Sequence, residues 1–300
     1  MLSIRNLSKT YGNQVKALDN VSLDIPPGMF GLLGPNGAGK SSLMRTIATL
    51  QGADSGEVVF DGINVAEQPQ QVRATLGYLP QDFNVYPRIS AYQLLDHIAI
   101  LKGITKAKER KALVDRLLEQ TNLHQVRKKA VATFSGGMRQ RFGIAQALIG
   151  DPKLIIVDEP TAGLDPEERN RFHNLLADIG QHKVVILSTH IVEDVADLCP
   201  RMAVLADGRI QLEGEPQVLT NELDGQIWRI TVDKQDVAAT MENFPVISSR
   251  LQGGRSVLHV LASENPGAGF ETVTPDLEDV YFATLHRVRQ QQSSTQSNAA

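Results

Sequence analysis

The most regular feature of the chain is a set of short apolar runs, with helix-like segments between them. Residues 29–33, 153–157 and 184–187 are almost uninterrupted aliphatic stretches. Runs of this length without polar alternation predict strands that are buried on both faces. Between the last two runs, apolar residues in 172–179 recur at helical spacing. This alternation of strand and helix predicts an α/β fold with a parallel core sheet.

A helical block interrupts the alternation between about residues 83 and 150. Apolar residues recur every three or four positions in 90–103 and again in 106–121. That spacing puts them on one face of a helix, so we expect helices that pack against each other. Shorter strands are expected at residues 2–7, 15–25, 56–60 and 76–79.

The pattern changes again near residues 221–225. Beyond this point the sequence predicts strands at 226–232, 246–251 and 257–261, and helices at 236–243 and 275–287. We therefore expect a large domain over residues 1–220, a small α+β domain over 221–288 and a tail over 289–300. The tail is polar and low in complexity, which is typical of disorder.

Composition narrows the possible functions. Of the 300 residues, 42% are hydrophobic, enough for a sizeable core. The net charge of −4 does not indicate a nucleic-acid-binding protein, and no nucleic-acid partner is expected. The single cysteine, Cys199, excludes an internal disulfide and is expected to be a small core residue. No apolar run approaches the roughly 20 residues that span a bilayer, so we expect any membrane association to use a partner.

A glycine-rich segment lies between the apolar run 29–33 and the helix-like segment 41–50, and it matches the phosphate-loop pattern G-x-x-x-x-G-K-[ST]. Glycines let backbone N–H groups turn towards a polyphosphate at the positive end of a helix. Lys40 is expected to reach the β- and γ-phosphates, and the Ser41 hydroxyl to bind Mg²⁺. The sequence therefore predicts binding of a nucleoside triphosphate by Gly34, Pro35, Asn36, Gly37, Ala38, Gly39, Lys40, Ser41 and Ser42.

Two acidic residues follow the apolar run 153–157. Asp158 ends the predicted strand, where a phosphate-loop protein holds a carboxylate near Mg²⁺. Glu159 is then expected to face the γ-phosphate, where a general base polarises the attacking water. A strand that ends in a solvated Asp-Glu turn is the alternative, and the phosphate loop makes it the weaker one.

A further segment resembles a known family. Residues 134–141, FSGGMRQR, resemble the signature sequence of ATP-binding-cassette (ABC) ATPases, and they precede the acidic pair as in that family. The other family motifs follow in order: Tyr11 as the adenine-stacking aromatic, Gln81 in the Q-loop, Asp165 in the D-loop and His190 as the switch histidine. The resemblance covers residues 1–220. It implies the ABC form of the phosphate-loop NTPase fold, with a parallel core sheet, an antiparallel β subdomain and an inserted helical subdomain.

Two signature positions depart from the family pattern. The family usually has Gln at the position of Met138 and Leu at the position of Phe134. The groups that the resemblance expects to touch the nucleotide, Ser135 and the backbone of Gly136 and Gly137, are intact. We therefore expect a working signature.

The resemblance also implies a mechanism. Two cassettes are expected to dimerise head to tail around two ATP molecules, each ATP lying between Lys40 of one cassette and Ser135 of the other. A homodimer and a heterodimer both fit. Residues 83–86 are expected to dock a helix of a partner. The implied Mg²⁺ ligands are Ser41, Gln81 and Asp158, and the implied catalytic groups are Glu159, His190, Gln81 and Lys40.

Three classes of ABC protein share such a cassette: transporter energy subunits, translation ATPases that act on ribosomes, and chromosome or repair ATPases. The chain has one cassette, no basic linker and no long coiled coil between Gln81 and Ser135, which favours a transporter. Residues 274–282 are similar to the C-terminal element of bacterial exporter ATPases, which pair with separate membrane-spanning subunits. We expect an exporter ATPase on the cytoplasmic face of the membrane, held there by permease subunits, with a ribosomal ATPase as the alternative.

Overall fold

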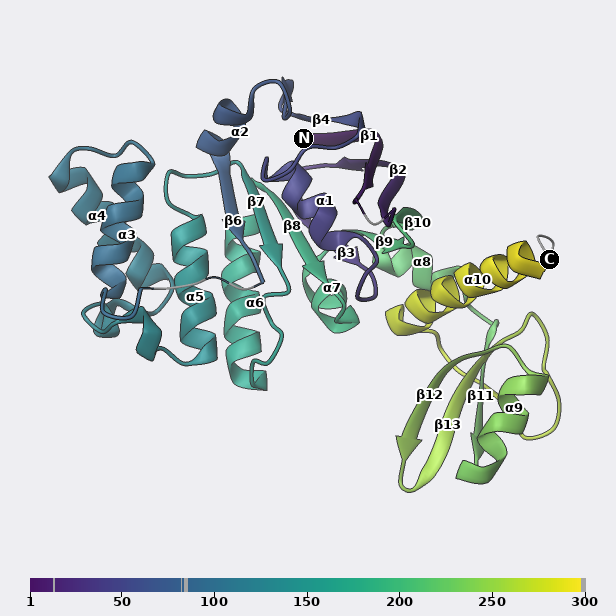
Figure 1. Ribbon diagram of the computed structural model, residues 1–300. Coiled ribbons are helices and arrows are strands. Elements are labelled where there is room, and N and C mark those ends of the chain that lie inside the picture. Colours follow the sequence, from purple (N-terminus) through teal and green to yellow (C-terminus); the bar gives the residue numbers. More distant parts are fainter. Residues whose placement is uncertain (13, 82, 84–85, 298–300) are drawn as a thin grey trace.

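The buried aliphatic runs form the central sheet of the protein. The computed structural model describes residues 1–297 except 13, 82 and 84–85 (Figure 1). The sheet has six strands: β3 (Gly28–Leu33), β6 (Leu76–Leu79), β7 (Leu154–Asp158), β8 (Val184–Thr189), β9 (Arg201–Ala206) and β10 (Arg209–Gly214). Their order is β10-β9-β3-β8-β7-β6, and all neighbours pair in parallel except β10 with β9. The predicted parallel α/β core is confirmed.

The central sheet separates two apolar cores. Successive residues of a strand point to opposite faces. In β3, Phe30 and Leu32 therefore belong to one cluster, and Met29 and Leu33 to the other. Burial on both faces explains why these strands carry no polar alternation. Cys199 is buried in the cluster that contains Met29, as expected for a core residue.

An antiparallel sheet and helix α1 (Lys40–Ile47) cover the face that carries Phe30. The sheet has the order β2-β1-β4-β5, with β1 (Leu2–Thr10), β2 (Lys16–Ile25), β4 (Ser55–Phe60) and β5 (Ile63–Asn64). This is the antiparallel subdomain that the resemblance implied. The short strand β5 and helix α2 (Pro69–Thr75) were not predicted from the sequence.

Helices cover the other face. The inserted block contains α3 (Ala91–Leu101), α4 (Ala107–Gln120), the 3₁₀ turns η1 (His124–Val126) and η2 (Val131–Thr133), and α5 (Gly136–Ala147). Helix α3 begins with a capping box, in which the side chains of Ser90 and Gln93 each accept from the other's backbone N–H. Helices α6 (Pro166–Gly180) and α7 (Val192–Leu198) complete the layer. The predicted helical block is present.

A second, smaller antiparallel sheet follows helix α8 (Pro216–Asn221). Its order is β12-β13-β11-β14, with β11 (Ile227–Val232), β12 (Val246–Gln252), β13 (Arg255–Leu261) and β14 (Glu271–Thr272). The turn η3 (Lys234–Asp236) and helix α9 (Val237–Asn243) connect β11 to β12. The three longer strands match the three strands predicted for this region.

Helix α10 (Leu277–Ser297) lies between the small sheet and the central sheet (Figure 1). It contacts β12 of the small sheet, and also α7, α8 and β9. Its buried residues Val280, Tyr281 and Leu285 join the same apolar cluster as Met29. The helix corrects the expectation of a disordered tail from residue 289, because it runs on to Ser297. Once packed turns have formed a helix, each further Gln or Ser adds to it at little cost.

Candidate active site

The phosphate-loop segment is a tight turn between β3 and α1. Gly37 and Gly39 have positive φ values of 82° and 106°, which glycine adopts without steric cost. A Cβ atom at Gly34 would lie 2.3 Å from the carbonyl oxygen of Leu205, and one at Gly39 would lie 2.2 Å from that of Ala17. Glycine is therefore required at two places where other backbone approaches the loop.

Lys40 folds back over this loop. Its Nζ donates to the carbonyl oxygens of Gly34 at 2.6 Å and Pro35 at 3.3 Å. It also lies 3.4 Å from Oε1 of Glu159, in an ion pair whose two side chains are only 6% and 7% exposed. The ammonium is thus held at the bottom of the loop, where the helix α1 N-terminus also favours negative charge.

Glu159 connects the phosphate loop to His190. Its Oε2 lies 2.6 Å from Nδ1 of His190, and its backbone N–H donates to the carbonyl of Ser188. Glu159 has a φ of 49°, which turns the chain sharply as it leaves β7. Because β7 and β8 are adjacent parallel strands, their carboxyl ends bring Glu159 and His190 to one edge of the sheet. The sequence placed both residues here.

A cleft of about 640 Å³ opens above these groups. The predicted residues Tyr11, Gln81, Glu159, His190 and the loop from Pro35 to Ser42 all line it. Gly34 and Asp158 are buried and support it from beneath. The cleft is also lined by residues that the sequence did not single out for the site: Val15, Lys16, Ala17, Asp207, Gly208 and Gln292. Asp-Gly is a tight-turn signal that could have found the pair at 207 and 208.

Asp158 has an oxygen suited to a cation. Its side chain is buried, and Oδ1 has no hydrogen-bond partner among the described residues. Burial raises the pKa of the Asp158 carboxyl, and the neighbouring charge of Glu159 acts in the same direction. A divalent cation bound beside Asp158 would favour the ionised carboxylate and so lower its pKa again. Mg²⁺ needs one or two carboxylates together with water and phosphate oxygens, so this single buried acid fits it.

Tyr11 is tied to the phosphate loop by hydrogen bonds. Its hydroxyl lies 3.0 Å from Oγ of Ser42 and donates to Oε1 of Gln51 at 3.0 Å. The Gln51 amide nitrogen donates to the carbonyl of Ser42 at 2.9 Å and to Oγ1 of Thr46 at 3.1 Å. Gln51 therefore holds Tyr11 and Ser42 together. No sequence motif marks this residue.

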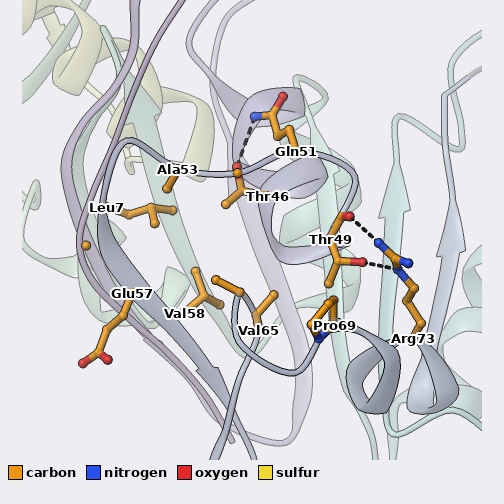
Figure 2. Close-up of a pocket in the computed structure, with 13 residues that line it drawn as sticks. Leu7, Thr46, Thr49, Gln51, Ala53, Glu57, Val58, Val65, Pro69 and Arg73 are labelled. Atoms are coloured by element: carbon orange, nitrogen blue, oxygen red, sulfur yellow. Dashed lines mark hydrogen bonds between the residues drawn. The ribbon is translucent and has the colours of Figure 1, made fainter.

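Gln51 and Thr46 also line a smaller hollow of about 230 Å³ behind α1 (Figure 2). Apolar side chains from β1, β4 and the loop before α2 form most of its wall, including Leu7, Val58 and Val65. Gln51, which bonds Tyr11, therefore also forms part of the wall of this hollow.

The signature segment lies apart from this cleft. Ser135 caps helix α5, and its Oγ accepts from the backbone N–H of Met138 at 3.2 Å. Ser135 and Gly136 are exposed, whereas Phe134 is buried with its ring edge-on to Phe142. Met138 is partly buried against the same core. The two departures from the family pattern are therefore packing residues, and the exposed Ser135 does not line the cleft of its own chain.

The predicted partner-docking segment is only partly described. Residues 84–85 lie outside the described residues. Phe83 is partly buried against the apolar core, close to the position that a Cβ of Gly143 would occupy. Tyr86 is exposed. The docking role of this segment stays a prediction.

A buried polar cluster connects the D-loop to the switch segment. Asp165 caps α6 by accepting from the N–H of Glu168 at 2.9 Å. Behind it, the fully buried Asp194 of α7 accepts hydrogen bonds from Thr161 and from Arg169. Nε2 of His173 lies 2.8 Å from the same carboxylate. Sequence reasoning missed this cluster because its members come from separate segments with no local pattern.

The chain is similar to known proteins along most of its length. A family model described as ABC transporter matches residues 18–162. The chain is 32% identical to the uncharacterized ABC transporter ATP-binding protein YxlF of Bacillus subtilis, over 95% of this chain and 100% of that protein. It is 38% identical to the Nod factor export ATP-binding protein I of Rhizobium etli, over 75% of this chain and 71% of that protein.

Other relatives are much longer. The chain is 36% identical to the human phospholipid-transporting ATPase ABCA7 over 73% of its own length, but it spans only 10% of that protein.

Solved structures share the fold. The dimeric structure of MJ0796, a bacterial ABC transporter cassette, is 29% identical with a TM-score of 0.66, and covers 72% of this chain and 98% of that one. The structure of cbiO1 from Clostridium perfringens, part of the ABC transporter complex cbiONQ, is 28% identical with a TM-score of 0.66. It covers 74% of this chain and 90% of that chain. Among the residues described here, no helix is both long and apolar enough to cross a membrane.

Proposed function

This chain belongs to the ABC transporter family as an ATP-binding ATPase cassette, and from that premise we propose that it drives export through separate transmembrane permease subunits. The observation that carries the proposal is the arrangement of Lys40, Glu159 and His190 under the phosphate loop, in a cleft large enough for a nucleotide. A full-length relative and a Nod factor export protein support the transporter setting.

The contacts of the site residues support a separate role for each of them in ATP hydrolysis. Lys40 would hold the γ-phosphate, because its ammonium already lies at the bottom of the phosphate loop. Glu159 is the proposed general base, since its carboxylate is buried, is within reach of the same position and is oriented by His190. His190 is half exposed and lies at the mouth, where it can also contact the γ-phosphate. Gln81 lines the same cleft and leads into the helical block.

ATP would bring Mg²⁺ with it. The buried Asp158, the Ser41 hydroxyl and Gln81 are the proposed residues around the ion, and the unpartnered Oδ1 of Asp158 is the observation that supports them. Bound Mg²⁺ would neutralise charge on the phosphate oxygens. Asp158 itself is fixed by the end of β7, so it needs no rearrangement to meet the cation.

The site is proposed to be completed by a second cassette. Ser135 stands exposed at the N-terminus of α5, where the positive end of the helix dipole favours a phosphate. It does not line the cleft of its own chain, so a nucleotide could meet it only on a partner molecule. The dimeric structure of the similar cassette MJ0796 supports this arrangement. Binding of ATP would then join two cassettes, and its hydrolysis would release them.

The proposed location is the cytoplasmic face of the membrane, with the chain bound to permease subunits. The similarity to cbiO1, which is part of a transporter complex, supports such a partner. The export direction is supported by the Nod factor export relative.

Affinity capture tests the transporter assignment. A tagged Glu159→Gln variant, which should retain ATP, would be captured with Mg-ATP from solubilised native membranes and separately from cytosol, with Lys40→Ala as the control that should bind ATP more weakly. Mass spectrometry should identify a multi-span membrane protein in the first sample. Ribosomal proteins from cytosol without any membrane protein would overturn the proposal.

A further inference from the structure

One residue in the lining of the nucleotide cleft comes from the C-terminal helix. Gln292 of α10 lines the same cleft as Tyr11 and the phosphate loop. Its Nε2 donates to the carboxylate of Asp207, which also lines the cleft. None of the ATPase motifs includes Gln292, which lies beyond the exporter-like element at residues 274–282. The structure therefore gives the small C-terminal domain a direct contact with the proposed nucleotide site.

The sheet order shows at which end of the cleft Gln292 lies. The phosphate loop follows β3, and the catalytic groups follow β6, β7 and β8 on one side of it. The turn at Asp207 and Gly208 follows β9, on the other side of β3. This turn is held to the phosphate loop and to β2, because Gly208 donates to the carbonyl of Ala38 and accepts from Asp19 N–H. Gln292 therefore lies beside the β9–β10 turn, on the opposite side of the phosphate loop from Glu159 and His190 and so away from the proposed γ-phosphate position.

Hydrogen bonds and packing hold helix α10 in place, and with it the side chain of Gln292 at the cleft. At its start, Asp276 and Asp279 each accept from the other's backbone N–H. Asp279 is buried and lies 2.7 Å from Nδ1 of His259 in β13. One turn before Gln292, Val288 is buried in the apolar cluster of the central sheet. Helix α10 is therefore held both at its start and one turn before Gln292.

We propose that Gln292 contacts the base or ribose of the bound nucleotide, so that the C-terminal helix forms one wall of the nucleotide site. With its nitrogen turned to Asp207, the amide presents its oxygen as an acceptor. The donors at this end of an adenine nucleotide are the ribose hydroxyls and the 6-amino group of the base. A hydrogen bond of this kind adds modestly to affinity, about five-fold in the dissociation constant.

ADP is the probe that tests this contact, because it carries the same base and ribose as ATP and is not hydrolysed. Its dissociation constant would be measured by calorimetry for the full chain and for Gln292→Ala. Gln290→Ala is the matched control: it makes the same change on the same helix, but Gln290 lies beside His286 and does not line the cleft. Alanine favours helix, so neither change should unfold α10.

We expect Gln292→Ala to weaken ADP binding about five-fold and Gln290→Ala to leave it unchanged. Repeating the titrations with 2′-deoxy-ADP and with inosine diphosphate locates the contact. If the difference between wild type and Gln292→Ala disappears with the first analogue, the ribose is the partner; if it disappears with the second, the adenine amino group is. Equal affinity of wild type and Gln292→Ala for ADP would overturn the proposal, and so would an equal loss in both variants.

Discussion

The Glu159 carboxylate has two expected effects: it competes with the γ-phosphate for Lys40, and it acts as the general base. Replacing Glu159 with Gln removes both, and each can be measured separately. In the structure, Glu159 pairs with Lys40 at 3.4 Å and with His190 at 2.6 Å. Glutamine keeps the shape of the side chain and one acceptor oxygen, replaces the other oxygen with an NH₂ donor, and removes the charge. Lys40 keeps its bonds to the carbonyls of Gly34 and Pro35, so the variant should fold normally.

The γ-phosphate of ATP must compete with Glu159 for Lys40. Two unit charges about 4 Å apart attract by about 4 kcal/mol at an effective dielectric constant of about 20, and desolvation of a buried pair offsets much of this. We expect a net gain of about 1–2 kcal/mol when the competing charge is removed, which tightens triphosphate binding about five- to thirty-fold. The loss of a general base should lower kcat by about 100- to 10,000-fold.

Both quantities can be measured on the purified chain. Affinity would be titrated with a non-hydrolysable ATP analogue, and turnover would be followed by phosphate release at saturating Mg-ATP. Glu193→Gln is the control, because Glu193 is an exposed acid on α7 whose side chain is 63% accessible and lies outside the cleft. If Glu159→Gln bound the analogue no more tightly than wild type, the competition between Glu159 and the γ-phosphate would be refuted. Turnover within about ten-fold of wild type would refute the assignment of the base.

Three further predictions follow. Lys40→Ala should lose ATP affinity by at least about ten-fold, since a charge-assisted contact is lost, and equilibrium binding checks this. Gln51→Leu should raise KM for ATP several-fold with little change in kcat, because Tyr11 and Ser42 lose the amide that joins them; an unchanged KM would contradict this. Asp194→Asn should destabilise the fold by about 3 kcal/mol at neutral pH, seen as a lower urea midpoint. Although burial raises the pKa of Asp194, hydrogen bonds from His173 and Thr161 hold it below its usual value. Its stabilising effect is therefore present above the unfolded pKa near 4, and the difference between wild type and variant should shrink as pH falls below that value.

The sequence predicted those parts of the site that depend on short stretches of chain. The phosphate loop is one continuous segment whose glycines are required by local backbone conformation, so its pattern and its structure correspond. Asp158 and Glu159 follow an apolar run, and their place at the end of a buried strand follows from that run alone. His190 was identified through the family resemblance, and the strand β8 that precedes it brings it to the same edge of the sheet.

Other parts of the site depend on contacts between distant segments, and no local pattern marks them. Asp207 and Gln292 are 85 residues apart, and their contact depends on how α10 packs against the central sheet. Thr161 and Asp194 meet only because α7 folds back beside the loop that leaves β7. A buried carboxylate needs hydrogen-bond partners, and these come from the elements that surround it in the folded protein. Which residues are its partners therefore depends on the assembled fold.

The two signature positions that differ from the family pattern also show how packing within the fold decides what a residue does. From the sequence, Met138 and Phe134 raised a question about the nucleotide contact of the signature. In the structure, Phe134 packs edge-on against Phe142 and Met138 leans on the same core, whereas Ser135 is exposed at the start of α5. A substitution at a buried position is constrained by volume, and a substitution at an exposed contact position is constrained by the ligand. The two departures therefore belong to the packing of the helical block, and Ser135 stays exposed, as the proposed contact with a nucleotide on a second molecule requires.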